Sequence, residues 1–176
     1  MKIVNPTESY TSDVYYIDLL HPESYKFKIK EIASSLSKIN RFTGGTKFPY
    51  SVALHSIYVS MLVSPRNAKA ALLHDASEAY IGDFISPVKN AVPALQLIED
   101  NIQSEIYKQF NLIPDKYDIR QADMTMLEIE RKLFFPESLV DHWYDFTTLL
   151  DFNIDEVDCY TAEKMFLLRW YDLNDG

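Results

Sequence analysis

The stretch 72–89 constrains the fold more than any other part of this 176-residue sequence. It places His74 beside Asp75 and adds two more carboxylates and a lysine, within surroundings rich in leucine, alanine and isoleucine. Charged side chains on a core-facing segment are strongly destabilising unless they are paired. A divalent cation resolves this conflict, because imidazole and carboxylate groups are its ordinary ligands. The stretch therefore predicts a metal centre inside an apolar core.

The overall composition narrows the class of protein. An apolar fraction of 47% over this length is enough for one domain with a real core, which we place at 1–176 with an irregular arm at about 1–24. The net charge of −9 argues against a nucleic-acid polymer or an anionic membrane as the main partner. Cys159 is the only cysteine, which excludes an intrachain disulfide and fits a reducing cytoplasm. No apolar run has the length of a membrane span or of a secretory leader.

The spacing of apolar residues predicts an all-α fold. Only four glycines are present, and neither a dinucleotide-binding nor a P-loop glycine motif occurs. Ser51, Ser64 and Asp118 are the expected helix caps, and Gly82 is the expected stop. We expect loops at Gly44-Gly45 and at 83–89, and a short extended piece around 14–17. About six helices are predicted, over 26–39, 51–63, 65–80, 93–110, 119–134 and 155–170.

Four residues are candidate metal ligands: His55, His74, Asp75 and Asp123. Each lies on or beside an apolar helical face. A single residue of this kind is more often a hydrogen-bonded core group than a ligand. The adjacent His74-Asp75 pair, combined with the two outlying residues, favours the metal interpretation.

The same residues carry a resemblance to a known family. A histidine, a downstream His-Asp pair and a distant aspartate on separate helices resemble the HD-domain metal-dependent phosphohydrolases. The resemblance covers roughly residues 25–135. Within this family, the sequence is similar to the small bacterial 5′-deoxyribonucleotidases. It is nearer still to compact phage and prophage relatives, which include dATP triphosphohydrolases. The segments that carry it are Arg41-Phe42-Thr43-Gly44-Gly45, Ser51-Val52-Ala53-Leu54-His55, His74-Asp75-Ala76-Ser77-Glu78, Gly82-Asp83, Pro87-Val88-Lys89 and Gln121-Ala122-Asp123.

The resemblance implies catalytic roles for two carboxylates. One divalent ion (Co²⁺, Mn²⁺, Zn²⁺ or Mg²⁺) is expected on the four ligands, where it activates a water molecule and polarises a phosphoryl oxygen. Glu78 is expected to orient or deprotonate this water. Asp83 is expected to assist Glu78 or to protonate the leaving oxygen.

The resemblance also implies a substrate pocket. Arg41 and Lys89 are the expected phosphate contacts, and Arg41 suits a bidentate contact. Phe42 stands where many relatives have a tryptophan and is expected to stack on the base. Ile85 and Pro87 are expected to line the same pocket.

These expectations lead to a metal-dependent enzyme that removes phosphate from 2′-deoxynucleotides. A dATP triphosphohydrolase is the preferred interpretation, and a 5′-deoxynucleoside monophosphatase of broad base specificity is the alternative. A non-catalytic nucleotide sensor of the same fold is the alternative from another class. We expect a homo-oligomer in the cytoplasm of a bacterium or of a phage-infected host.

Overall fold

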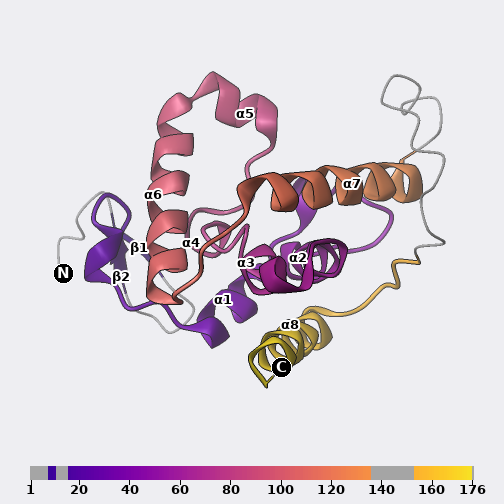
Figure 1. Ribbon diagram of the computed structural model, residues 1–176. Helices are drawn as coiled ribbons and strands as arrows, with labels where there is room; N and C mark the ends of the chain where they lie inside the picture. The colour runs from indigo at the N-terminus through magenta and orange to yellow at the C-terminus, as the bar shows by residue number, and fades with distance from the viewer. Residues whose placement is uncertain (1–7, 11–15, 136–152, 176) are drawn as a thin grey trace.

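The computed structural model describes residues 8–10, 16–135 and 153–175, and its architecture is mostly helical (Figure 1). A short antiparallel pair of strands, β1 (Glu8–Tyr10) and β2 (Tyr16–Asp18), precedes the helices. The described helices are α1 (Ile29–Leu36), α2 (Val52–Leu62), α3 (Ala68–Leu72), α4 (Glu78–Ile81), α5 (Ser86–Ala91), α6 (Pro93–Gln109), α7 (Lys116–Phe134) and α8 (Cys159–Asp175).

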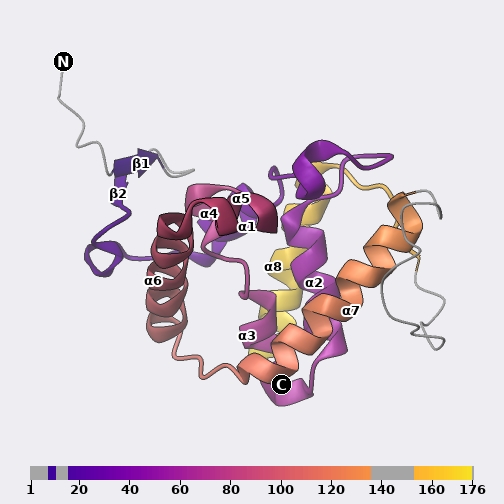
Figure 2. The same cartoon turned by 90° about the horizontal axis from the view of Figure 1, so that it is seen from above.

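Helix α2 is the centre of the core. It packs against α3, α7 and α8, and Figure 2 shows it running between α7 and α8. Most of its side chains are buried, including Leu54, Ile57 and the imidazole of His55. Ser51 caps its first turn by accepting a hydrogen bond from the Leu54 amide at 3.3 Å, as predicted. A helix buried on nearly every face fixes the direction of any polar side chain that it carries.

The helix predicted over 65–80 is interrupted at the His-Asp pair. α3 ends at Leu72, and residues 73–77 form turns with bonds between residues three apart, such as the Ala76 amide to the Leu73 carbonyl at 3.1 Å. Gln103 stabilises this break, because its side chain accepts from the Ser77 amide at 3.0 Å and donates to the Leu73 carbonyl at 2.7 Å. The single-helix prediction was therefore wrong over these five residues. Gly82, with φ at 87°, ends α4 as expected.

Several other helix boundaries differ between the sequence prediction and the structure. Ser64 does not cap a helix, since its hydroxyl instead donates to Asp118 at 2.7 Å, ahead of a 3₁₀ turn at Pro65–Asn67. The cap of α7 is Asp115 and not Asp118. α5 begins within the predicted loop over 83–89, where Pro87 occupies the first turn of a helix. α1 is shorter than predicted, and α8 runs to Asp175.

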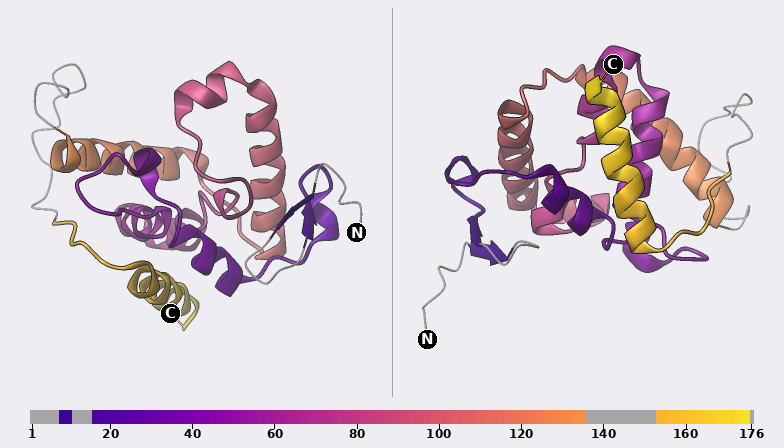
Figure 3. Two further views of the ribbon diagram at one scale, coloured as in Figure 1. Left: turned by 180° about the vertical axis from the view of Figure 1, so that it is seen from behind. Right: turned by 90° about the horizontal axis from the view of Figure 1, so that it is seen from below.

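The N-terminal arm has some regular structure. β2 overlaps the extended piece predicted around 14–17, of which residues 14 and 15 lie outside the described part. A 3₁₀ turn at Pro22–Ser24 packs against α6, so the strand pair lies at the α6 end of the molecule (Figure 3). Within the described ranges, no helix combines the length and apolarity needed to cross a membrane.

Candidate metal centre

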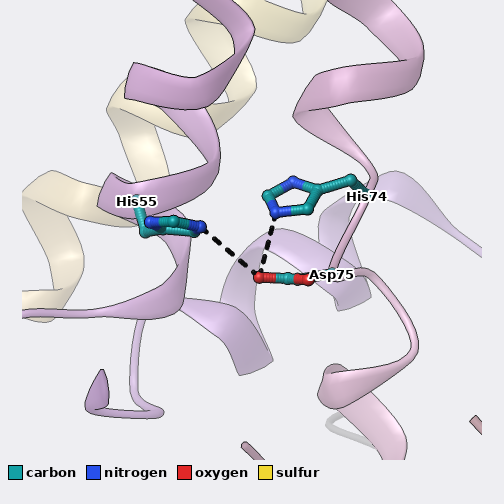
Figure 4. Close-up of side chains that lie close together, drawn as sticks. All are labelled: His55, His74 and Asp75. Atoms are coloured by element: carbon teal, nitrogen blue, oxygen red, sulfur yellow. Dashed lines mark ion pairs between the residues drawn. The ribbon is translucent and has the colours of Figure 1, made fainter. Parts of the chain in front are cut away.

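Three parts of the chain bring the predicted ligands together. His55 comes from α2, and His74 and Asp75 come from the turn between α3 and α4 (Figure 4). Each of these three side chains offers one ligand atom within 4.8 Å of the others. Asp123 on α7 adds a carboxylate oxygen 3.1 Å from His55 Nε2 and 3.9 Å from His74 Nε2. The group formed by His55, His74, Asp75 and Asp123 is called the ligand cluster below.

Both histidines direct the same ring nitrogen into the ligand cluster. The His74 Nδ1–H donates to the Ala71 carbonyl at 2.8 Å, because a carbonyl oxygen can only accept. His55 Nδ1 lies 2.6 Å from a Glu130 carboxylate oxygen. This leaves each Nε2 as the inward-facing atom, buried and without a well-oriented hydrogen-bond partner among the described residues.

The atoms that surround these two nitrogens are themselves acceptors. Asp75 Oδ2 lies 3.2 Å from His74 Nε2 and 3.7 Å from His55 Nε2. Lone pairs that face one another in a buried space are unfavourable unless a proton or a cation lies between them. Two imidazole nitrogens and two carboxylates are also a common ligand set for divalent first-row metals. The residues present therefore fit a divalent cation.

Glu130 is a buried support for this site that the sequence analysis missed. Its carboxylate, fully shielded from solvent, accepts from the Tyr50 hydroxyl at 2.8 Å and from two Arg41 nitrogens at 3.1 and 3.2 Å, besides contacting His55. Burial alone raises the pKa of Glu130, but His55 and Arg41 bring it below its usual value. A carboxylate behind a metal-binding histidine fixes the ring and raises its basicity.

The electrostatics keep the cluster aspartates ionised. Burial acts to raise the pKa of Asp75, but His74, His55 and Arg41 hold it well below its usual range. Burial and Arg41 act to lower the pKa of His55, yet Glu130 and Asp123 bring it to about 9. Two ionised aspartates draw in either protons or a metal ion.

A cavity of about 290 Å³ borders the ligand cluster through Asp75 and Asp123. It also contains every residue predicted for catalysis or substrate contact: Arg41, Phe42, Glu78, Asp83, Ile85, Pro87 and Lys89. The same cavity is lined by four residues that the sequence analysis did not select: Phe84, Ser86, Leu127 and Arg131. We call it the Arg41 cavity. The motifs recognised in the sequence thus meet at one place.

Within the Arg41 cavity, Glu78 is nearly buried, with 3% of its surface exposed. One oxygen lies 3.6 Å from Lys89 Nζ, and the other has no hydrogen-bond partner among the described residues. Burial, followed by the charges of Asp75 and Asp83, raises the pKa of Glu78 to about 10. Burial also raises the pKa of Asp83, which Arg41 partly offsets. A buried carboxyl group with a raised pKa beside a metal-ligand set is suited to proton transfer.

Lys89 has a second partner that the sequence did not indicate. Its ammonium group lies 2.7 Å from Glu99 on α6. Arg41, by contrast, is held on one side by Glu130, and its remaining Nη1 lies 3.7 Å from Asp75 Oδ2. The two cations are therefore positioned by buried or half-buried carboxylates and face the same cavity.

The protein is therefore a mostly helical protein with a cluster of two histidines and a carboxylate that could hold a metal ion. Its sequence is 35% identical over 126 residues to the uncharacterized protein YfdR of Escherichia coli, covering 71% of this chain and 70% of that protein. It is 34% identical over 142 residues to an uncharacterized protein of Rhodobacter capsulatus, covering 71% of this chain and 72% of that protein. The chain belongs to the same family as these two bacterial proteins. No family model matches it.

Proposed function

We propose that this protein is an HD-type, divalent-metal-dependent phosphohydrolase that removes phosphate from 2′-deoxynucleotides, with dATP as the preferred substrate. The observation that carries the proposal is the convergence of His55, His74 and Asp75 with both Nε2 atoms left for a ligand. The resemblance of the motifs supplies the substrate class.

The chemistry follows from the residues around the cluster. A divalent ion bound there supplies Lewis acidity and lowers the pKa of a water molecule. Glu78, which has one carboxylate oxygen without a hydrogen-bond partner among the described residues, would orient a water molecule in the Arg41 cavity and take or return its proton. Arg41 Nη1 and Lys89 supply positive charge to a phosphate in the same cavity.

Phe42 supplies an apolar surface for the nucleoside. Its backbone has φ at 54°, in the left-handed region that residues other than glycine rarely adopt. Its ring packs edge-on against Phe135 with ring centroids 5.2 Å apart, and Arg41 lies 5.4 Å from its centroid. Strained backbone that surrounding contacts hold in place is common at ligand sites.

A 5′-deoxynucleoside monophosphatase remains the second candidate, because the Arg41 cavity alone contains three cations (Arg41, Lys89 and Arg131) and two aromatic rings (Phe42 and Phe84). The non-catalytic sensor is disfavoured by the presence of both Glu78 and Asp83 in that cavity. Self-association, which the resemblance implies, is measured by size-exclusion chromatography with light scattering.

The direct test is a hydrolysis assay. Protein stripped with a chelator is reloaded with Mn²⁺, Co²⁺, Zn²⁺ or Mg²⁺ and offered deoxy- and ribonucleotides as mono- and triphosphates. We expect metal-dependent release of phosphate or polyphosphate, greatest with a deoxynucleotide. No turnover with any combination contradicts the proposal and favours the sensor.

Two substitutions separate metal binding from chemistry. Asp75→Ala should abolish metal retention, measured by elemental analysis after desalting. Glu78→Gln should keep the metal, and its hydrolysis rate should fall about 10²–10⁴-fold, as expected for a general acid–base residue. Glu31→Gln is the matched control, because Glu31 is also buried but lies outside the Arg41 cavity. Near-wild-type turnover in Glu78→Gln would remove this residue from the mechanism.

A further inference from the structure

A second cavity, of about 390 Å³, borders the ligand cluster through His74 and Asp123. α6 lines one side of it with residues that include Gln103 and Tyr107, and α7 lines the other with Lys116 and Arg120. We call it the α6–α7 groove. Asp123 lines both the groove and the Arg41 cavity, so the two spaces meet at the ligand cluster. None of the motifs recognised in the sequence includes the cationic residues of this groove.

Two cations of the groove have no ion-pair partner among the residues that the structure describes. Lys116 and Arg120 are four residues apart, so they project from the same face of α7. Both are exposed, and neither forms an ion pair with another residue in the described part of the chain. This contrasts with Arg41 and Lys89, which are both held by carboxylates.

The two cations lie at increasing distances from Asp123 along α7. With a rise of about 1.5 Å per residue, Arg120 lies about 4.5 Å and Lys116 about 10 Å along the helix axis from Asp123. Successive cations leading away from a metal-ligand residue match the successive charges of a polyphosphate chain. Asp100, which also lines the groove, opposes an anion, although it accepts a hydrogen bond from Gln96 at 3.0 Å.

We propose that the α6–α7 groove binds the polyphosphate part of the substrate, with Lys116 and Arg120 contacting the phosphates beyond the one at the ligand cluster. The nucleoside then lies toward Phe42 in the Arg41 cavity. This inference rests on the proposed function for the placement of one phosphate at the cluster. It makes the groove the determinant that separates nucleoside triphosphates from monophosphates.

The test measures binding of two inorganic probes. Tripolyphosphate and orthophosphate are titrated by calorimetry into metal-loaded protein, wild type and Lys116→Ala/Arg120→Ala. Loss of two charge-assisted contacts should weaken tripolyphosphate binding about tenfold and leave orthophosphate binding within about twofold. Both substituted side chains are exposed, and circular dichroism verifies that the variant is folded.

A matched control removes the same charge elsewhere. Lys47→Ala/Lys132→Ala also deletes two exposed cations, but neither residue lines the groove or the Arg41 cavity. Tripolyphosphate binding in this control should stay within about twofold of wild type, since general charge effects are screened by salt. Asp100→Asn should tighten tripolyphosphate binding by about two- to fivefold, because it removes a like charge.

The outcomes distinguish this inference from the proposed function. Equal weakening in the two double variants, or no tripolyphosphate binding by the wild type, overturns the groove assignment even if nucleotides are hydrolysed. A selective loss in Lys116→Ala/Arg120→Ala supports the groove as a polyphosphate site even if no nucleotide is hydrolysed. In that case, only the proposed function fails.

Discussion

The two histidines of the ligand cluster have the same inward-facing Nε2 but are held by different means. His55 is oriented by Glu130, a residue 75 positions away in sequence, within a buried network that also contains Arg41 and Tyr50. His74 is oriented by the carbonyl of Ala71, only three residues earlier, in a turn that Gln103 stabilises. One half of the site therefore depends on the packing of α2 against α7, and the other on local backbone geometry.

The largest expected effect comes from breaking the remote support. Glu130→Ala leaves the largely buried Arg41 guanidinium and the buried His55 without the carboxylate that hydrogen-bonds to both. The free energy of unfolding should fall by about 3–5 kcal/mol, as for loss of one partner from a buried ion pair. Metal affinity should fall about 10–100-fold, as for other residues that support a metal-binding histidine. Urea unfolding and metal titration measure the two quantities.

Glu130→Gln is the matched variant for this experiment, because it keeps an acceptor for Tyr50 while it removes the charge. It should lie between wild type and Glu130→Ala in both measurements. An unfolding free energy for Glu130→Ala within about 1 kcal/mol of wild type would show that His55 is held by packing alone.

A smaller effect is expected from breaking the local support. Gln103→Ala removes two half-buried hydrogen bonds to the turn, and should lower the free energy of unfolding by about 1–3 kcal/mol. Metal affinity should fall less than in Glu130→Ala, because the Ala71 carbonyl still orients His74. Gln96→Ala on the same helix is the control, since Gln96 is exposed and bonds only to Asp100 among the described residues. If Gln103→Ala lowered metal affinity as much as Glu130→Ala, the contrast between the two histidines would be lost.

The last expected effect has the opposite sign, a gain in stability in metal-free protein. The pKa of Glu78 is raised from 4.5 to about 10 on folding. A group with a raised folded-state pKa contributes stability fully below pH 4.5 and loses it as the pH rises toward 10. Glu78→Gln cannot ionise, so its Tm should exceed that of wild type by several degrees at pH 8.

The pH dependence provides the check on that prediction. The difference in Tm between Glu78→Gln and wild type should shrink toward pH 5, where ionisation of the unfolded chain is only partial. Differential scanning calorimetry of chelator-treated samples at both pH values measures it. A Tm difference that is the same at both pH values would mean that Glu78 is not held protonated in the fold.

The sequence predicted α2 and α6 well because local signals mark where they begin, a capping Ser51 for α2 and Pro93 in the first turn of α6. α2 and α6 lie within a residue or two of their expected bounds. The break after Leu72 was missed because Leu72, Leu73 and the neighbouring alanines all favour helix, and its cause is a side chain 30 residues away, Gln103. The cap of α7 was misplaced because Asp115 and Asp118 are equally capable caps, and only the tertiary contact of Asp118 with Ser64 decides between them.

The candidate site also combines residues that the local sequence indicates with residues that only the fold brings near. The four candidate ligands were recognisable from residue type and order, but Glu130 was missed as one more acid on a charged helix. A signal for it exists, because Glu130 follows Met126 by four residues and Asp123 by seven, and so lies on the face that points toward the cluster. Glu99 gave no comparable signal, since only the fold brings α6 beside Lys89.

Helix α6 joins three parts of the molecule through its side chains. Gln109 accepts from the Phe27 amide at 3.2 Å, Gln103 holds the turn at 73–77, and Glu99 holds Lys89. The three side chains are spread over about 15 Å along the axis of α6. A shift of α6 along its axis would displace the segment before α1, the backbone of His74 and the Lys89 ammonium together. Side chains of this one helix thus fix the relative positions of the segment before α1, the turn that carries His74 and the Lys89 ammonium group.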